Sequence, residues 1–358
     1  MSKLRVLVVD DSALMRKLLT QILDSDRDIE VVGSAMDAYA AREKIKQLKP
    51  DVITLDVEMP KMDGLSFLSN LMRLHPMPVV MVSTLTERGA EVTLKALDLG
   101  AVDFVSKPKV DLTHSLEECA AEIIGKVKAA GMASVQALVI NAKSSSKQGA
   151  TSKAMTRTEA LSIGRKYQTT DKIIAIGAST GGTEAIKEVL VRMKPSCPGI
   201  LITQHIPPVF SRSFAERMNQ CSPLIVCEAE DGQQILPGHV YIAPGDRHLL
   251  LTRDGARYVC ALSDGEPVNR HKPAVDVLFD SVAEKAADNA VGVILTGMGR
   301  DGAKGMKHMR DAGAHTISQD EKSCVIWGMP RAAVEEQAVV EEMPLLKIAD
   351  SLNGIAHG

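Results

Sequence analysis

Short segments rich in β-branched residues alternate with longer amphipathic segments along the first 130 residues of this chain. Such alternation is typical of successive βα units on a parallel sheet. The predicted strands are Leu4–Val9, Glu30–Ser34, Val52–Leu55, Val79–Val82 and Asp103–Val105. The predicted helices lie near 12–24, 37–48, 64–74, 87–99 and 112–129. Because crossovers between parallel strands are right-handed, a doubly wound (βα)5 sheet is the simplest topology.

A second βα series starts near residue 172. Its predicted strands are Lys172–Ile176, Gly199–Gln204, Val291–Leu295 and His315–Ser318, with helices at Thr183–Met193 and Asp301–Ala312. Residues 224–270 contain short strands separated by dipeptides that predict hairpin turns. These dipeptides are Asp231-Gly232, Pro237-Gly238, Pro244-Gly245, Asp254-Gly255 and Asp264-Gly265. The second half is therefore predicted as a mostly parallel, doubly wound α/β domain with an antiparallel hairpin excursion.

The length of 358 residues exceeds what one ordinary core accommodates and indicates two domains. Residues 131–170 are polar and small, with Lys143-Ser-Ser-Ser-Lys-Gln-Gly-Ala-Thr-Ser-Lys153 at their centre, so they are predicted to form a linker. The expected organisation is a first domain over 1–130, the linker, and a second domain over 171–358.

Charge and hydropathy exclude several classes of protein. No apolar run approaches the roughly 18 residues needed to cross a bilayer, and the start of the chain leads directly into a strand. A cytoplasmic protein without direct membrane insertion is expected. The formal net charge of −3 provides no basic field for nucleic acid, and the six cysteines form no C-x-x-C pair that would indicate a zinc site. We expect a monomer.

Polar residues gather at the carboxyl ends of the first-domain strands, which is the edge where open parallel sheets bind ligands. Asp10 and Asp11 follow the first strand and Asp56 ends the third, while Ser83 and Lys107 follow the fourth and fifth. Three converging carboxylates repel one another unless a hard cation such as Mg²⁺ joins them. Each of these residues taken alone is more often a solvated strand-end group.

Together these residues resemble the receiver domain of two-component response regulators. The resemblance covers the whole first domain and lies in Val8-Val-Asp-Asp11, Asp56-Val-Glu-Met-Pro-Lys-Met-Asp-Gly64, Val82-Ser83 and Lys107-Pro108. It implies that Asp56 accepts a phosphoryl group and binds Mg²⁺ together with Asp10 and Asp11. It also implies that Ser83 and Lys107 contact the phosphoryl group and that Phe104 is the aromatic switch residue. It further implies a histidine kinase as the phosphodonor.

In the second domain, Ile176-Gly-Ala-Ser-Thr-Gly-Gly182 places Ser179 in a tight turn between a strand and a helix, in a G-x-S-x-G arrangement. A serine hydroxyl needs a base to take its proton and a carboxylate to orient that base. His205 follows the strand Gly199–Gln204, and Asp301 follows Val291–Leu295. All three residues are thus expected at one edge of a sheet, where they can form a catalytic triad.

Other interpretations of these residues remain open at this point. Ser179 could cap the following helix, or its glycine turn could bind a phosphate. His205 alone is more often a packed histidine, and Asp301 alone is more often a first-turn helix carboxylate. The Thr296-Gly-Met-Gly299 turn favours catalysis, because its backbone N–H groups could face an oxyanion, with the Met298 amide as the preferred donor.

The second domain resembles the catalytic domain of the chemotaxis methylesterases. The motifs are Gly177-Ala-Ser-Thr-Gly-Gly182, Gln204-His-Ile-Pro-Pro208, Ala243-Pro-Gly-Asp246, Pro267-Val-Asn-Arg-His-Lys-Pro273 and Thr296-Gly-Met-Gly-Arg-Asp-Gly302. The resemblance implies Ser179 as nucleophile, His205 as base and Asp301 as orienting carboxylate, with Thr180 hydrogen-bonding the histidine.

The function implied by both resemblances is that of a phosphorylation-activated serine carboxylic-ester hydrolase. It would hydrolyse glutamate γ-methyl esters on chemoreceptors to glutamate and methanol and would also deamidate receptor glutamines, with no cofactor for the esterase step. One alternative is a receiver-controlled phosphate- or nucleotide-binding α/β domain without esterase activity. A DNA-binding output is another, but it would need a helix-turn-helix or a basic stripe after residue 150, and the sequence contains neither.

Overall fold

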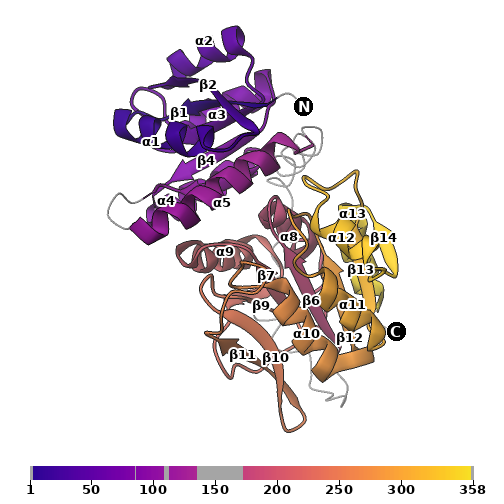
Figure 1. Ribbon diagram of the computed structural model, residues 1–358. Helices are drawn as coiled ribbons and strands as arrows, with labels where there is room; N and C mark the ends of the chain where they lie inside the picture. The colour runs from indigo at the N-terminus through magenta and orange to yellow at the C-terminus, as the bar shows by residue number, and fades with distance from the viewer. Residues whose placement is uncertain (1–2, 85, 109–112, 135–171, 356–358) are drawn as a thin grey trace. The chain divides into compact units, whose positions relative to one another are not determined.

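The computed structural model describes residues 3–84, 86–108, 113–134 and 172–355. The chain divides into two compact units, Met1–Ser146 and Lys147–Gly358. In Figure 1 the first unit is coloured indigo to magenta and the second rose to yellow. From residue 135 onward, the predicted linker over 131–170 lies outside the described residues.

The first unit is a five-stranded parallel sheet with the strand order β2-β1-β3-β4-β5. The strands are β1 (Leu4–Val9), β2 (Ile29–Ala35), β3 (Val52–Asp56), β4 (Val79–Ser83) and β5 (Asp103–Ser106). The helices are α1 (Ala13–Asp24), α2 (Ala38–Leu48), α3 (Gly64–Leu74), α4 (Glu87–Asp98) and α5 (Thr113–Gly131). The predicted (βα)5 fold is confirmed, and the element ends shift by no more than two residues.

Local sequence explains why these elements form where they do. Every residue of β3 and β4 is buried, as expected for central strands of a parallel sheet covered on both faces. Four helices begin at side chains that accept a hydrogen bond from the backbone N–H three residues on, namely Ser12, Asp37, Asp63 and Thr86. The helix starts are thereby fixed directly after the loops.

The second unit is built on a seven-stranded sheet with the order β14-β13-β12-β6-β7-β9-β8, and each neighbouring pair is parallel. The strands are β6 (Ile173–Ala178), β7 (Gly199–Gln204), β8 (Ile225–Glu228), β9 (His239–Ile242), β12 (Ala290–Ile294), β13 (His315–Gln319) and β14 (Glu341–Met343). The helices are α8 (Gly182–Leu190), α9 (Pro208–Cys221), α10 (Val275–Ala286), α11 (Ala303–Asp311), α12 (Met329–Glu335) and α13 (Leu345–Ile355).

The first strand of this unit, β6, lies in the middle of the sheet, with β7 on one side and β12 on the other (Figure 1). The chain thus reverses its direction of growth across the sheet at β6. At such a switch point the loops at the carboxyl ends of the strands turn away from each other and leave a crevice. Ligand-binding residues are therefore expected after β12, β6 and β7.

An antiparallel excursion is present, but most of the predicted hairpin turns are wrong. Strands β10 (His248–Asp254) and β11 (Arg257–Ser263) pair antiparallel around Asp254-Gly255. Among the described residues, the other four Gly-containing dipeptides join no antiparallel strand pair, and β8 and β9 pair parallel instead. These dipeptides favour a chain reversal, but the partner of a strand is decided by contacts distant in sequence.

Helix α10 packs unusually close to the central strand. A Cβ atom added to Gly177 would lie 2.2 Å from Val275 Cγ1, so only glycine fits at that point of β6. This close approach brings the first turn of α10 to the carboxyl edge of the sheet. None of the helices in the described ranges is long and apolar enough to cross a membrane.

Candidate active site

Three neighbouring strands bring the predicted triad residues to one edge of the second sheet. Ser179 directly follows β6, His205 directly follows β7, and Asp301 lies in the loop between β12 and α11. The order β12-β6-β7 places these three loops side by side. Residues separated by up to 122 positions in sequence therefore meet.

The three side chains form a continuous hydrogen-bonded chain. Ser179 Oγ lies 3.2 Å from His205 Nδ1, and His205 Nε2 lies 2.8 Å from Asp301 Oδ2. The side chains of His205 and Asp301 are 9% and 2% exposed. Because a carboxylate can only accept, Nε2 carries the proton and the lone pair of Nδ1 faces the serine. The two ring nitrogens thus exchange the roles they have in the chymotrypsin triad.

The turn that carries Ser179 is held by its glycines and by Gln204. A Cβ atom on Gly182 would lie 2.2 Å from Gln204 Oε1, and Gln204 Nε2 donates to the Ser179 carbonyl at 2.9 Å. Gly181, with φ of 76°, is the N-cap residue of α8. The interpretation of Ser179 as a helix cap is therefore wrong, and its hydroxyl is available to the histidine.

Asp301 is surrounded by donors. Its Oδ2 accepts from the Val275 N–H at 2.7 Å as well as from His205, and its Oδ1 accepts from Asn269 Nδ2 at 2.8 Å and the Asp276 N–H at 3.2 Å. Burial alone would raise the pKa of this carboxyl, but the hydrogen bond and charge of His205, together with these donors, lower the pKa to about 2. The group is a carboxylate at neutral pH.

The Thr296–Gly299 turn lies against the serine. The Ser179 N–H donates to the Thr296 carbonyl at 3.1 Å, and a Cβ atom on Gly297 would lie 2.8 Å from Ser179 Cβ. The next N–H group, that of Met298, makes no hydrogen bond to any described residue. The buried Thr180 accepts through its carbonyl from Thr296 Oγ1 at 3.1 Å, and the predicted bond from its hydroxyl to His205 stays a prediction.

The sequence pattern indicates no role for individual residues of the 267–273 loop, although this loop carries one of the family motifs. The His271 ring stacks on the His205 ring with centroids 3.7 Å apart and planes 12° apart. Asn269 contacts Asp301 from the same loop. The motif signals that the loop matters, but nothing local indicates that it reaches residues near 205 and 301.

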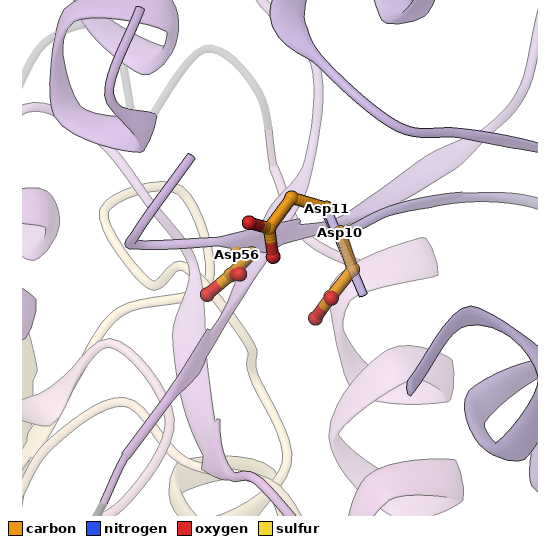
Figure 2. A group of neighbouring side chains, drawn as sticks. All are labelled: Asp10, Asp11 and Asp56. Carbon is orange, nitrogen blue, oxygen red and sulfur yellow. The ribbon is translucent and has the colours of Figure 1, made fainter. Parts of the chain in front are cut away.

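A second polar cluster lies at the carboxyl edge of the first sheet. Asp10 and Asp11 follow β1 and Asp56 ends β3 (Figure 2), and one carboxylate oxygen of each lies within 4.8 Å of the others. Asp10 Oδ2 is buried and makes no hydrogen bond to the described residues. Burial, with the Asp10 charge, raises the pKa of Asp56 to about 6 although Lys107 opposes the shift. This oxygen-only donor set fits a hard divalent cation.

The remaining predicted residues of this cluster lie on or directly after strands β4 and β5. Lys107 Nζ lies 2.8 Å from Asp56 and 3.6 Å from Asp10, and the Lys107 N–H donates to the Ser83 carbonyl at 2.8 Å. Ser83 is buried at the end of β4. Phe104 is buried in β5, with Lys126 Nζ 4.8 Å from the centre of its ring.

Comparison with known proteins gives both units a family. Residues 174–352 match the family model described as CheB methylesterase, and residues 6–117 match the response regulator receiver domain. A protein from Hydrogenovibrio crunogenus named protein-glutamate methylesterase/protein-glutamine glutaminase is 56% identical over 370 residues, which cover 98% of each chain. A relative of the same name, numbered 1, from Xanthomonas euvesicatoria is 58% identical over 97% of this chain and 96% of its own.

A solved structure is similar as well. The crystal structure of the Thermotoga maritima CheB methylesterase catalytic domain is 39% identical, with a TM-score of 0.51, and the match covers 52% of this chain and 98% of that one. The two family models cover separate parts of this chain, in the order receiver domain and then methylesterase. The chain therefore belongs to the CheB methylesterase family, with a response regulator receiver domain at its N-terminal end.

Proposed function

We propose that this protein hydrolyses glutamate γ-methyl esters on chemoreceptors with Ser179 as nucleophile, His205 as general base and Asp301 as orienting carboxylate. The observation that carries the assignment is the hydrogen-bonded chain of these residues, with contacts of 3.2 and 2.8 Å. Relatives that are more than half identical to this chain are named protein-glutamate methylesterase, and these names support the choice of substrate. No feature of the site favours the alternative of a phosphate-binding domain without activity.

The reaction follows from the direction of these hydrogen bonds. Ser179 Oγ attacks the ester carbonyl carbon while its proton passes to His205 Nδ1. The imidazolium then gives this proton to the methoxide oxygen, and methanol leaves the acyl-enzyme. In the second half, water loses a proton to His205 Nδ1 as it attacks the acyl carbon. His205 then returns this proton to Ser179 Oγ as the acyl–oxygen bond breaks, so that glutamate leaves and the free serine is regenerated. Asp301 stays ionised and stabilises the imidazolium.

The same site is suited to a receptor glutamine. Its carbonyl carbon is attacked in the same way, and the proton held by His205 is given to the departing ammonia instead of methanol. An amide is a poorer electrophile than an ester, so deamidation is the slower of the two activities. The double name of the relatives supports this second activity.

The Met298 amide is our candidate for the oxyanion donor, and Gly297 gives a test of it. Gly297→Ala would place a methyl group 2.4 Å from Met329 Sδ and 2.8 Å from Ser179 Cβ, so the turn must move away from the serine. We expect kcat to fall by about 10²- to 10³-fold, the usual cost of losing one such donor. Gly354→Ala is the matched control, because nothing lies within 4 Å of the added methyl group. Wild-type methanol release by Gly297→Ala would contradict the assignment.

The first unit is proposed to control this reaction through phosphorylation of Asp56. Asp10, Asp11 and Asp56 would bind Mg²⁺, which would neutralise the carboxylates and the incoming phosphoryl oxygens. Lys107 is placed to pair with the phosphoryl group, since it already contacts Asp56. Ser83 would hydrogen-bond this group, and Phe104 would respond to it. The phosphodonor would be a chemotaxis histidine kinase, and we propose that the protein acts as a cytoplasmic monomer.

Methanol release from methylated receptors, with and without a small-molecule phosphodonor, tests the proposed function. We expect the phosphodonor and Mg²⁺ together to raise the rate of the wild-type protein, and chelation of the metal to abolish the increase. Asp56→Asn should keep the basal rate and lose the whole increase, because an amide cannot accept the phosphoryl group. Absence of methanol release from the wild-type protein under all conditions would overturn the proposal.

A further inference from the structure

Asn269 connects the triad carboxylate to a second buried carboxylate. Its Nδ2 donates to Asp301 Oδ1 at 2.8 Å and to Asp276 Oδ2 at 2.7 Å. Asp276 lies in the first turn of α10 and is 6% exposed, while Asp301 is 2% exposed. A side-chain amide nitrogen has two hydrogens, so one is used for each carboxylate.

Two buried carboxylates that lie close together repel each other, and a hydrogen-bond donor shared between them reduces this repulsion. Burial and then the Asp301 charge raise the pKa of Asp276, although the Gly305 N–H donates to its other oxygen at 2.7 Å. A donor that is neutral and bidentate reduces the repulsion without adding a charge that would compete with His205 for Asp301. Lysine or arginine at this position would add such a charge.

We propose that Asn269 is a positioning residue for the esterase reaction: its amide fixes Asp301 to Asp276 on α10 and so sets the direction in which Asp301 meets His205 Nε2. The proposal rests on the function proposed above. Asn269 does not touch the reacting atoms and acts through Asp301 alone. The chemical demand is for two N–H donors that diverge from one uncharged nitrogen, one toward each carboxylate, and among short side chains an amide provides this.

The backbone at Asn269 is consistent with this role. Its φ of 53° lies in the left-handed region, where asparagine is among the better tolerated non-glycine residues. The turn is closed by two backbone hydrogen bonds between Val268 and His271, of 2.9 and 3.0 Å. His271, from the same turn, stacks on His205. One short turn therefore contacts both the base and the carboxylate of the triad.

Kinetics of Asn269→Ala and Asn269→Asp test the proposal in the full-length protein. The alanine variant loses both donors, and we expect kcat to fall about 10-fold with little change in KM, the usual cost of one hydrogen bond to a charged group. The aspartate variant also adds a third carboxylate, and we expect a loss of about 100-fold. The titratable groups around this position include Asp276, Asp301, His205 and His271, and Asp280 acts on Asp276 as well. Because a further negative charge favours protonation of this cluster, the acid limb of the kcat/KM profile should move to higher pH.

Asn353→Asp is the matched control. Asn353 is also a buried amide of this unit, bonded to the Lys194 N–H and the Arg192 carbonyl, far from Asp301 in the chain. We expect it to lower the melting temperature while leaving kcat and the pH profile close to wild type. The proposal is overturned if the Asn269 variants keep both, or if they lose activity only in proportion to stability as the control does. Ser179→Ala separates the two claims, because an active serine variant would overturn the proposed function rather than the role of Asn269.

Discussion

Ser179→Ala is expected to lower kcat for methanol release by about 10⁴- to 10⁶-fold, a larger effect than loss of the Asp301 charge should have. The change removes the oxygen that forms the acyl-enzyme, so His205 has no proton to take. What remains is the rate that substrate binding and the oxyanion donor provide without a nucleophile. The measurement is methanol release from methylated receptors at saturating substrate.

The variant should fold normally, which makes the result interpretable. The Ser179 hydroxyl contacts His205, whereas the backbone of the turn is held by Thr296 and Gln204 through groups that alanine keeps. Ser222→Ala is the control, because its buried hydroxyl makes no hydrogen bond to the described residues. Wild-type melting temperature with lost activity is the expected pattern for Ser179→Ala. Activity within 10-fold of wild type would leave the serine without a covalent role.

The fold could be predicted from sequence where the pattern itself carries the information. The buried strands β3 and β4 are mostly apolar and rich in β-branched residues, and α1 begins after a serine that caps it. Hydrophobic periodicity and helix capping are local properties, so the predicted ends of strands and helices lie within a few residues of the observed ends. The pairing of β8 with β9 could not be predicted in this way, because it depends on β9 lying next to β7 in the finished sheet.

The candidate triad was predictable for a related reason. Parallel strands share their carboxyl edge, so a serine, a histidine and an aspartate after three such strands are already candidates for contact. The sequence does not say that β12, β6 and β7 are immediate neighbours, and this order is what produces distances of 3.2 and 2.8 Å. Nor does it specify which nitrogen of His205 faces the serine.

The hydrogen-bond donors around Asp301 could not be predicted from the sequence pattern. Its donors come from the loop that carries Asn269 and from the first turn of α10, and that turn reaches the site because Gly177 lets α10 pack on β6. A glycine inside a strand and an asparagine inside a loop motif are visible in the sequence. Their connection is a matter of packing between elements almost 100 residues apart.

These donors determine what Asp301→Asn should do. Two N–H donors point at each carboxylate oxygen, from His205 and Val275 on one side and from Asn269 and Asp276 on the other. An amide has one oxygen, so its NH₂ group must face two donors on one side. If it faces His205, the ring must carry its proton on Nδ1 and cannot accept from Ser179. If it faces Asn269, the hydrogen bonds from Asn269 and the Asp276 N–H are lost, and only those from His205 and the Val275 N–H still hold residue 301.

Both arrangements of Asp301→Asn remove the charge that stabilises the imidazolium, and we expect kcat to fall by about 10³- to 10⁴-fold. Because the pKa of Asp301 is lowered against the effect of burial, chiefly by the hydrogen bond and charge of His205, the wild-type carboxylate is ionised throughout the neutral range, and the loss of kcat should persist across it. The same lowered pKa means that the ionised group stabilises the fold at neutral pH. This contribution is fully present above the ordinary pKa of the group and is lost as the pH falls through the lowered pKa, so the melting temperature of Asp301→Asn at pH 7 should also drop. Asp264→Asn is the control, since that carboxylate is 77% exposed and pairs with Arg247 at the surface. A kcat for Asp301→Asn within 10-fold of wild type would show that the carboxylate holds His205 without contributing its charge to the reaction.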